Sequence, residues 1–256
     1  MTFSLFSVIL TSDSESEGEH LRYRILSFNT QHCKNYISGR IDFDLFADTI
    51  RRLDPDIVGL NEMRGKGADP GYTAQTEILA EKLGYHYYFA KALDVDGCNP
   101  YGNALLSKHP ILSAETIGVP DPTVKDPKRH YETRCLLRAK IDVPSGLTVC
   151  ITHFGLNPEE KINAVKTVMT SLLPQKCILM GDFNLTPESP ELNPIREKLF
   201  DTATLFSRPL LSYPSDNPNV KIDYIFTTSD ISVLDADIPE IVASDHRPYL
   251  ATIEID

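Results

Sequence analysis

The chain has 256 residues, of which 41% are hydrophobic and 24% are charged, an ordinary balance for a soluble globular protein. Its formal net charge of −11 disfavours a nucleic-acid partner, without excluding one, unless a basic patch or a bound cation offsets it locally. No apolar run reaches the roughly 18 residues that cross a bilayer, so no transmembrane segment is expected.

The cysteines indicate which redox environment suits the chain. There are five, an odd number, and no two of them form a C-x-x-C pair. This favours buried free thiols in a reducing compartment over a disulfide framework or a zinc site. We therefore expect a cytoplasmic protein, and we expect it to be a monomer.

The first twenty residues differ in composition from the rest. Met1–Leu10 is apolar, but no basic residue precedes the apolar run and no small-x-small cleavage site follows it, as a secretory signal requires. The acidic, serine-rich TSDSESEGEH comes next and cannot bury enough apolar area to become ordered. We expect residues 1–20 to be a disordered or frayed leader and residues 21–256 to form one domain.

Short runs rich in Val, Ile, Phe and Tyr, bounded by Gly, Pro or Asn, predict β-strands along this domain. In chain order they are Arg22–Phe28, Asp56–Leu60, Tyr85–Ala90, Asn103–Leu106, Arg134–Ile141, Thr148–Ile151, Cys177–Met180, Ile222–Phe226 and Tyr249–Ile255. There is no internal repeat and no long linker between them. Many strands with a few interspersed helices indicate a single α+β domain.

Three helices are predicted between these strands. Apolar residues recur at helical spacing over Phe43–Leu53, and a second helix over Thr73–Leu83 ends at Gly84, a favourable residue after a helix. The third begins with Asn157 as N-cap, followed by Pro and an acid three positions on. Its predicted apolar face consists of Ile162, Val165, Met169 and Leu172.

Polar side chains stand at the ends of six apolar runs. An Asp after a strand is usually a turn residue or a helix cap, and a His there is usually structural, so each alone is weak evidence. If the strand ends converge, they form a pocket of carboxylates, imidazoles and amides. Carboxylates so close repel one another unless they are protonated or bridged by a cation, and oxygen ligands suit Mg²⁺ or Mn²⁺. The residues are Asn29, Glu62, His153, Asp182, Asn184, Asp223, Asp245 and His246.

Three motifs near the C-terminus carry a resemblance to a known family. GDFN at 181–184, IDYIF at 222–226 and SDHRP at 244–248 follow one another in the order typical of the endonuclease/exonuclease/phosphatase superfamily. That superfamily includes DNase I-like nucleases, inositol-polyphosphate 5-phosphatases and neutral sphingomyelinases. The resemblance extends over about Arg22 to Ile255. It implies a four-layer α/β/β/α sandwich of two mainly antiparallel sheets with outer helices, and a site where strand-end loops meet.

The resemblance also implies a Mg²⁺-dependent hydrolysis of a phosphoester, with Mn²⁺ as a possible substitute. Glu62 would be the main metal ligand, with Asn29 beside it and Asp245 on the same ion or on a second one. Some nucleases of the family carry a carboxylate two residues after the first Asn, where this chain has Gln31. A tightly held second metal is therefore less expected here.

The remaining roles implied by the resemblance concern the attacking water and the phosphate. Asp182 would orient or deprotonate the water, and Asn184 would donate a hydrogen bond to a phosphoryl oxygen. His246 would contact the phosphate, its ring oriented by Asp223, and His153 would be a second donor to the phosphate.

The motifs imply the bond that is cleaved but leave the substrate open. Asn103 and Arg134 match positions that are often polar in the family and are expected to contact the substrate. The short segment between residues 201 and 223 and the charge of −11 favour a small phosphorylated metabolite, a nucleotide or a lipid headgroup. A DNA or RNA endonuclease or exonuclease is the alternative. A catalytically idle binding domain is a third, but it predicts losses among the site residues, and the principal ones are all present.

Overall fold

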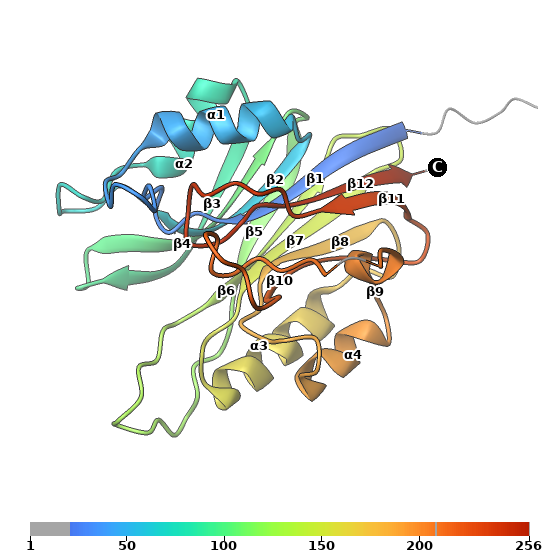
Figure 1. Cartoon of the computed structure of the whole chain (residues 1–256). Helices are drawn as coiled ribbons and strands as arrows, with labels where there is room; N and C mark the ends of the chain where they lie inside the picture. Colours follow the sequence, from blue (N-terminus) through green and yellow to red (C-terminus); the bar gives the residue numbers. More distant parts are fainter. Residues whose placement is uncertain (1–20, 208, 256) are drawn as a thin grey trace, which may run out of the picture.

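The apolar runs pair into two six-stranded sheets that pack face to face (Figure 1). The computed structural model describes residues 21–207 and 209–255, so the leader predicted at residues 1–20 lies outside the described part. The first sheet contains, in spatial order, β11 (Ser232–Asp237), β12 (Tyr249–Ile255), β1 (Leu21–Asn29), β2 (Ile57–Arg64), β4 (Asn99–Ser107) and β3 (His86–Val95). The second contains β5 (Ile111–Gly118), β6 (Cys135–Ile141), β7 (Leu147–His153), β8 (Cys177–Asp182), β10 (Asp223–Thr227) and β9 (Phe200–Asp201).

Each sheet is antiparallel except for one central parallel pair, β1 with β2 and β7 with β8. A parallel pair needs a crossover, and helices α1 (Phe43–Leu53) and α3 (Pro158–Ser171) supply the two. In each parallel pair the two strands therefore end side by side. Asn29 pairs with Asn61 at the end of β1 and β2, and His153 pairs with Asp182 at the end of β7 and β8. This register places the polar strand ends in one region of the molecule.

Four layers result, with helices on both outer faces of the paired sheets. Figure 1 shows α1 and α2 (Gln75–Leu83) over one face and α3 with α4 (Asn193–Arg196) over the other. Ile178 and Met180 of β8 pack between the sheets, whereas Cys177 and Leu179 of the same strand face α3. Because both faces are covered, the central strands read as continuous apolar runs rather than alternating ones. The predicted α+β sandwich is confirmed.

The helices begin and end close to the predicted residues. The first has the predicted bounds, the second begins at Gln75 rather than Thr73, and it ends at Gly84 in the left-handed conformation. No helix among residues 21–207 and 209–255 is long and apolar enough to cross a membrane. Two short 3₁₀ segments complete the helical elements described, Pro190–Leu192 and Thr202–Leu205.

The apolar face predicted for α3 is correct at three of its four positions. Val165 is buried, and Met169 and Leu172 pack against the same core, but Ile162 is 46% exposed. The buried side of the helix also contains Glu160, Ala164 and Val168. The Glu160 carboxylate can be buried there because it accepts hydrogen bonds from the Asn157 backbone N–H at 3.0 Å and its side-chain amide at 2.7 Å.

Some strands and one thiol also differ from the expectation. β5, β9 and β11 were not predicted, and all three are edge strands or short strands with few buried apolar side chains. The five cysteines are free, and four are buried as expected, but Cys98 is exposed in the hairpin between β3 and β4.

Candidate active site

The ends of β1, β2, β7, β8 and β10 meet in one polar cluster, together with the loop that precedes β12. Hydrogen bonds or short charge contacts link its members to one another. The cluster contains every strand-end residue that the sequence singled out, namely Asn29, Glu62, His153, Asp182, Asn184, Asp223, Asp245 and His246.

A glycine allows β8 to deliver Asp182 into this cluster. Gly181 has φ of +141°, and a Cβ added there would lie 1.9 Å from the carbonyl oxygen of Thr152 on β7. Only glycine fits so close to a neighbouring backbone. After it, Asn184 takes φ of +49°, and its backbone N–H donates to Asp182 Oδ1 at 2.9 Å. The GDFN segment therefore places Asp182 and Asn184 side by side at the end of the buried strand β8.

Asp182 occupies the centre of the cluster. Its Oδ2 lies 3.1 Å from Asn29 Nδ2, 3.5 Å from His153 Nε2 and 3.6 Å from His246 Nε2. Burial raises the pKa of Asp182 to about 7, because the lowering by His246 only partly offsets it and Asp223 raises it further. This carboxyl therefore gains or loses its proton near neutral pH.

His246 is held by a carboxylate at its other ring nitrogen. Its Nδ1 lies 2.8 Å from Asp223 Oδ2, and that oxygen also accepts from the Ser212 hydroxyl at 2.5 Å. Burial lowers the pKa of His246, but Asp223 and then Asp182 raise it more, to about 10. The ring is therefore a cation at neutral pH, and the predicted contact between Asp223 and His246 is present.

His153 has the opposite environment. Its Nδ1 lies 3.3 Å from a guanidinium nitrogen of Arg134, and its Nε2 lies 3.3 Å from Asn184 Nδ2. Burial, then the positive charges of Arg134 and His246, hold the pKa of His153 well below its ordinary value of 6.5. This imidazole is therefore neutral at physiological pH.

Glu62 lies at a distortion in β2. The pairing with β4 shifts register between Leu60 and Met63, and Glu62 takes φ of +61°, which costs about 1–3 kcal/mol for a residue other than glycine. Its Oε1 accepts from Asn29 Nδ2 at 3.1 Å, and its Oε2 lies 3.8 Å from His32 Nδ1. Burial raises the pKa of this carboxyl. This strained irregularity in β2 thus places a partly buried acid at the edge of the cluster.

Asp245 completes the acidic side of the cluster. Its Oδ2 accepts from Gln31 Nε2 at 3.0 Å, and its Oδ1 accepts from the Ser244 hydroxyl at 2.9 Å. Its charge also raises the pKa of Glu62. Gln31, at the position where some family members carry a carboxylate, therefore serves as a hydrogen-bond donor to an acid.

The donor set is compatible with a divalent metal ion. Glu62 and Asp245 both offer carboxylate oxygens, and after burial the charge of Asp245 is a further cause of the raised pKa of Glu62, so a hard cation would relieve the repulsion between them. Asn29, expected as a ligand, turns its Nδ2 rather than its Oδ1 toward Glu62 and would have to rotate its amide to coordinate an ion. Its role on the metal stays a prediction.

A second arrangement in the cluster could also hold an ion. Asp182, Asp223 and His246 offer ligand atoms that lie within 4.8 Å of one another, and all three residues are buried. His246 and Asp223 already bond each other in this group. An ion here would compete with that bond, whereas an ion at Glu62 would leave it intact.

Asn61, which sequence reasoning missed, and the predicted Asn103 connect the residues beneath the cluster. Asn61 donates to Asn103 Oδ1 at 2.8 Å and to the carbonyl of Thr152 at 2.9 Å, and its own oxygen accepts from the Asp182 backbone N–H at 3.0 Å. Asn103 is 2% exposed and also donates to the carbonyl of Cys135 at 3.0 Å. These amides join the two sheets beneath the site. The expected contact of Asn103 with the substrate stays a prediction.

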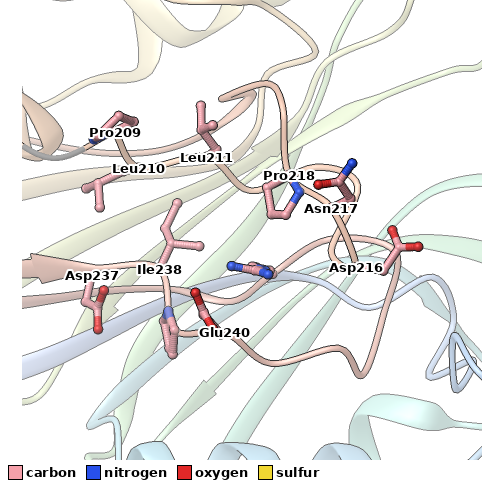
Figure 2. A pocket seen from close by; sticks show the side chains of 11 residues that line it. Pro209, Leu210, Leu211, Asp216, Asn217, Pro218, Asp237, Ile238 and Glu240 are labelled. Atoms are coloured by element: carbon pink, nitrogen blue, oxygen red, sulfur yellow. The ribbon is translucent and has the colours of Figure 1, made fainter.

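A cavity of about 580 Å³ lies next to the cluster but contains none of the predicted site residues (Figure 2). Asp216, Asp237 and Glu240 line it together with Arg247, the residue after His246. The Asp216 carboxylate accepts from the Tyr36 hydroxyl at 3.4 Å. The cavity is acidic and borders the site on the side of the β12 loop.

Comparison with known proteins identifies the family. Residues 26–246 match the model of the Endonuclease/Exonuclease/phosphatase family, so the chain belongs to that family. No curated protein matches the chain.

Solved structures share the fold at low sequence identity. An endonuclease/exonuclease/phosphatase from Beutenbergia cavernae has a TM-score of 0.74 and 23% identity, over 91% of this chain and 72% of that one. The Bacteroides thetaiotaomicron mannosyl-6-phosphatase has a TM-score of 0.73 and 16% identity, over 90% and 99%. ANGEL2, a 2′,3′-cyclic phosphatase solved with adenosine-2′,3′-vanadate, has a TM-score of 0.68 and 18% identity, over 92% and 96%.

Proposed function

We propose that this member of the endonuclease/exonuclease/phosphatase family is a Mg²⁺-dependent phosphoric ester hydrolase acting on a phosphomonoester or phosphodiester of a small metabolite, nucleotide or lipid headgroup. One observation carries the proposal: Asp182 Oδ2 lies 3.5 and 3.6 Å from the Nε2 atoms of two histidines, whose Nδ1 atoms lie against Arg134 in one ring and Asp223 in the other. These surroundings raise the pKa of Asp182 to about 7, raise that of His246 and lower that of His153. Carboxyl and imidazole groups whose surroundings push their pKa values apart are typical of acid–base sites.

In an in-line attack of water on phosphorus, each of these groups has a separate role. Asp182 accepts a proton from the attacking water, and its pKa near neutrality suits that task. His246 faces the phosphoryl oxygens with Nε2–H and a positive charge, while Asp223 holds Nδ1. Asn184 donates one amide N–H to the carbonyl of Phe154 at 3.0 Å, and its second N–H can donate to a phosphoryl oxygen. His153 adds another neutral donor.

Glu62 is the proposed principal ligand for Mg²⁺, with Asn29 and Asp245 as further ligands. When bound, the ion neutralises charge on the phosphoryl group and orients it. Mn²⁺ has the same preference for oxygen ligands and is the expected substitute. Glu62→Gln keeps the size of the side chain and removes its charge, so it should abolish Mg²⁺-dependent turnover with little loss of stability. Near-wild-type turnover at saturating Mg²⁺ would mean that Glu62 merely shapes the turn.

A small substrate fits the charge around the site better than a nucleic acid. The chain carries a net charge of −11, and the neighbouring cavity is lined by three carboxylates and one arginine. In the segment between β5 and β6, Lys125 and Arg129 are paired with Asp121 and Asp126, which offsets part of the positive charge there. Two fold neighbours are named as phosphatases, one of a mannosyl 6-phosphate and one of a 2′,3′-cyclic phosphate.

The compartment proposed is the cytoplasm. All five cysteines are free, and the exposed Cys98 thiol would persist only in a reducing environment. The protein is proposed to act as a monomer.

The proposal is tested by hydrolysis of p-nitrophenyl phosphate and bis-p-nitrophenyl phosphate, with Mg²⁺ and with EDTA. Release of p-nitrophenol that needs the metal and is lost in Asp182→Asn supports it. A screen of sugar, inositol and nucleotide esters then identifies the substrate class, and a supercoiled plasmid serves as the nuclease substrate. Nicking that is faster than every small-ester hydrolysis would favour the nuclease instead. No metal-dependent hydrolysis of any ester would contradict both.

A further inference from the structure

We propose that Arg134 is a positioning residue whose guanidinium fixes the orientation and tautomer of His153, so that Nε2–H rather than a lone pair faces the substrate. The family resemblance of the sequence implies instead that Arg134 itself contacts the substrate. The catalytic use of this donor rests on the proposed function, whereas the tautomer itself does not.

The geometry at Nδ1 selects the tautomer. A guanidinium can only donate hydrogen bonds, and a nitrogen of Arg134 lies 3.3 Å from His153 Nδ1. Nδ1 must therefore present its lone pair, and the single proton of the neutral ring is left on Nε2. That nitrogen lies 3.5 Å from Asp182 Oδ2, which is an acceptor.

The other tautomer would place two donors against each other. Asn184 Nδ2 lies 3.3 Å from His153 Nε2 and could donate to a lone pair there. Nδ1–H would then point at a charged guanidinium in a site where both side chains are over 90% buried. Each tautomer thus sets one ring N–H against a donor, Nε2–H against the neutral Asn184 amide or Nδ1–H against the charged guanidinium of Arg134. The contact with the buried charge costs more, and Nε2–H also has the Asp182 carboxylate as an acceptor. The charged donor therefore decides between the two tautomers.

A chain of contacts from helix α3 holds the guanidinium in place. A second guanidinium nitrogen of Arg134 lies 3.0 Å from Glu132 Oε2. The backbone N–H of Glu132 donates to Glu160 Oε1 at 2.9 Å, and Glu160 is the buried acid in the first turn of α3. Glu160 is therefore fixed both to the helix start and to the segment just before β6 that contains Glu132 and Arg134.

The tautomer can be measured directly on the full chain labelled with nitrogen-15 histidine. Long-range proton–nitrogen correlation spectra distinguish the protonated from the unprotonated ring nitrogen, and His153→Gln identifies the His153 signals by their loss. We expect wild-type His153 at neutral pH to carry its proton on Nε2. Arg134→Leu, which keeps an aliphatic stem but no donor, should convert His153 to a mixture or to the Nδ1–H form. Arg134→Lys, which keeps a charged donor, should retain most of the Nε2–H form.

A matched control is available four residues further on, in β6. Arg138 pairs with Glu115 and donates to the carbonyl of Ser171, away from the cluster. Arg138→Leu should leave the His153 spectrum unchanged. Wild-type protein with the proton on Nδ1, or an Arg134→Leu variant with a folded, wild-type spectrum for His153, would overturn the inference.

Turnover separates the positioning role from the proposed function. Arg134→Leu should lower kcat with little change in KM, by up to the roughly 10⁴-fold loss that follows when a catalytic histidine is held in the wrong tautomer, and Arg134→Lys should recover part of the loss. If the tautomer changes but turnover does not, Arg134 still positions His153, and the catalytic role proposed for His153 is wrong.

Discussion

His153 and His246 approach the same carboxylate oxygen from different strand ends, yet their surroundings give them opposite charges. Their Nε2 atoms lie 3.5 and 3.6 Å from Asp182 Oδ2, and each side chain is 6% exposed. Burial lowers the pKa of both rings. The difference lies at Nδ1, which meets the Arg134 guanidinium in one ring and the Asp223 carboxylate in the other. The partner at the far nitrogen, not burial, therefore decides which histidine is charged.

The largest effect is expected from removing the carboxylate that the two histidines share. Asp182→Asn keeps the size of the side chain but leaves no base, so kcat should fall by about 10³-fold, within the range for general acid–base groups. Thermal unfolding of the variant should remain cooperative. A loss of less than tenfold, measured on the best ester found, would remove Asp182 from the chemistry.

The pair formed by Asp223 and His246 should act as one unit. His246→Ala and Asp223→Ala should each cost orders of magnitude in kcat, and the double variant should be little worse than the poorer single one. Kinetics of the three variants under one condition give the comparison. A double-variant loss equal to the product of the single losses would show that the two groups act independently.

A smaller effect is expected from Ser212, which shares the carboxylate with His246. Its hydroxyl donates to Asp223 Oδ2 at 2.5 Å, and a hydrogen bond to a charged group contributes enough for about a tenfold loss when Ser212 becomes Ala. His246→Ala combined with Ser212→Ala should lose no more than His246→Ala alone. An added loss in the combined variant would mean that Ser212 acts on something other than the His246 pair.

The smallest effect concerns stability as a function of pH. The folded-state pKa of His246, about 10, lies above its ordinary value of 6.5. The stabilisation from its proton is therefore fully present below pH 6.5 and is lost as pH rises toward 10. The melting temperature of wild-type protein should fall more over this interval than that of His246→Gln. Parallel melting curves for the two proteins across the interval would contradict the raised pKa.

The sequence predicted the centre of the fold better than its edges. Strands such as β8, covered on both faces, appear as unbroken apolar runs like CILMG and were recognised. Edge strands such as β5 expose most of their residues, so ILSAETIG has no such signal. Helix bounds followed from caps, but the burial of Glu160 in α3 did not, because one of its hydrogen-bond donors is Glu132, 28 positions away.

The residues of the candidate site likewise fall into those that the sequence predicts and those that it does not. Residues at strand ends, such as Asp182 and His246, could be found because acids and imidazoles that interrupt apolar runs are conspicuous and occur in ordered motifs. Asn61 and Ser212 could not, because they act by bonding groups 121 and 11 positions away, and their local sequences give no sign of it. The sequence also gave no indication that Arg134 and Asp223 impose opposite states on the two rings.

The most direct test of the account is the titration of both histidines in one sample. Nitrogen-15 histidine spectra of the full chain in EDTA, recorded from pH 5 to pH 10, report the charge on each ring. The account predicts that His153 is already neutral at pH 6.5 and stays so as the pH rises, while His246 stays protonated until the pH approaches about 10. If both rings titrate together near pH 6.5, their different Nδ1 partners do not control their charge, and the division of labour around Asp182 is wrong.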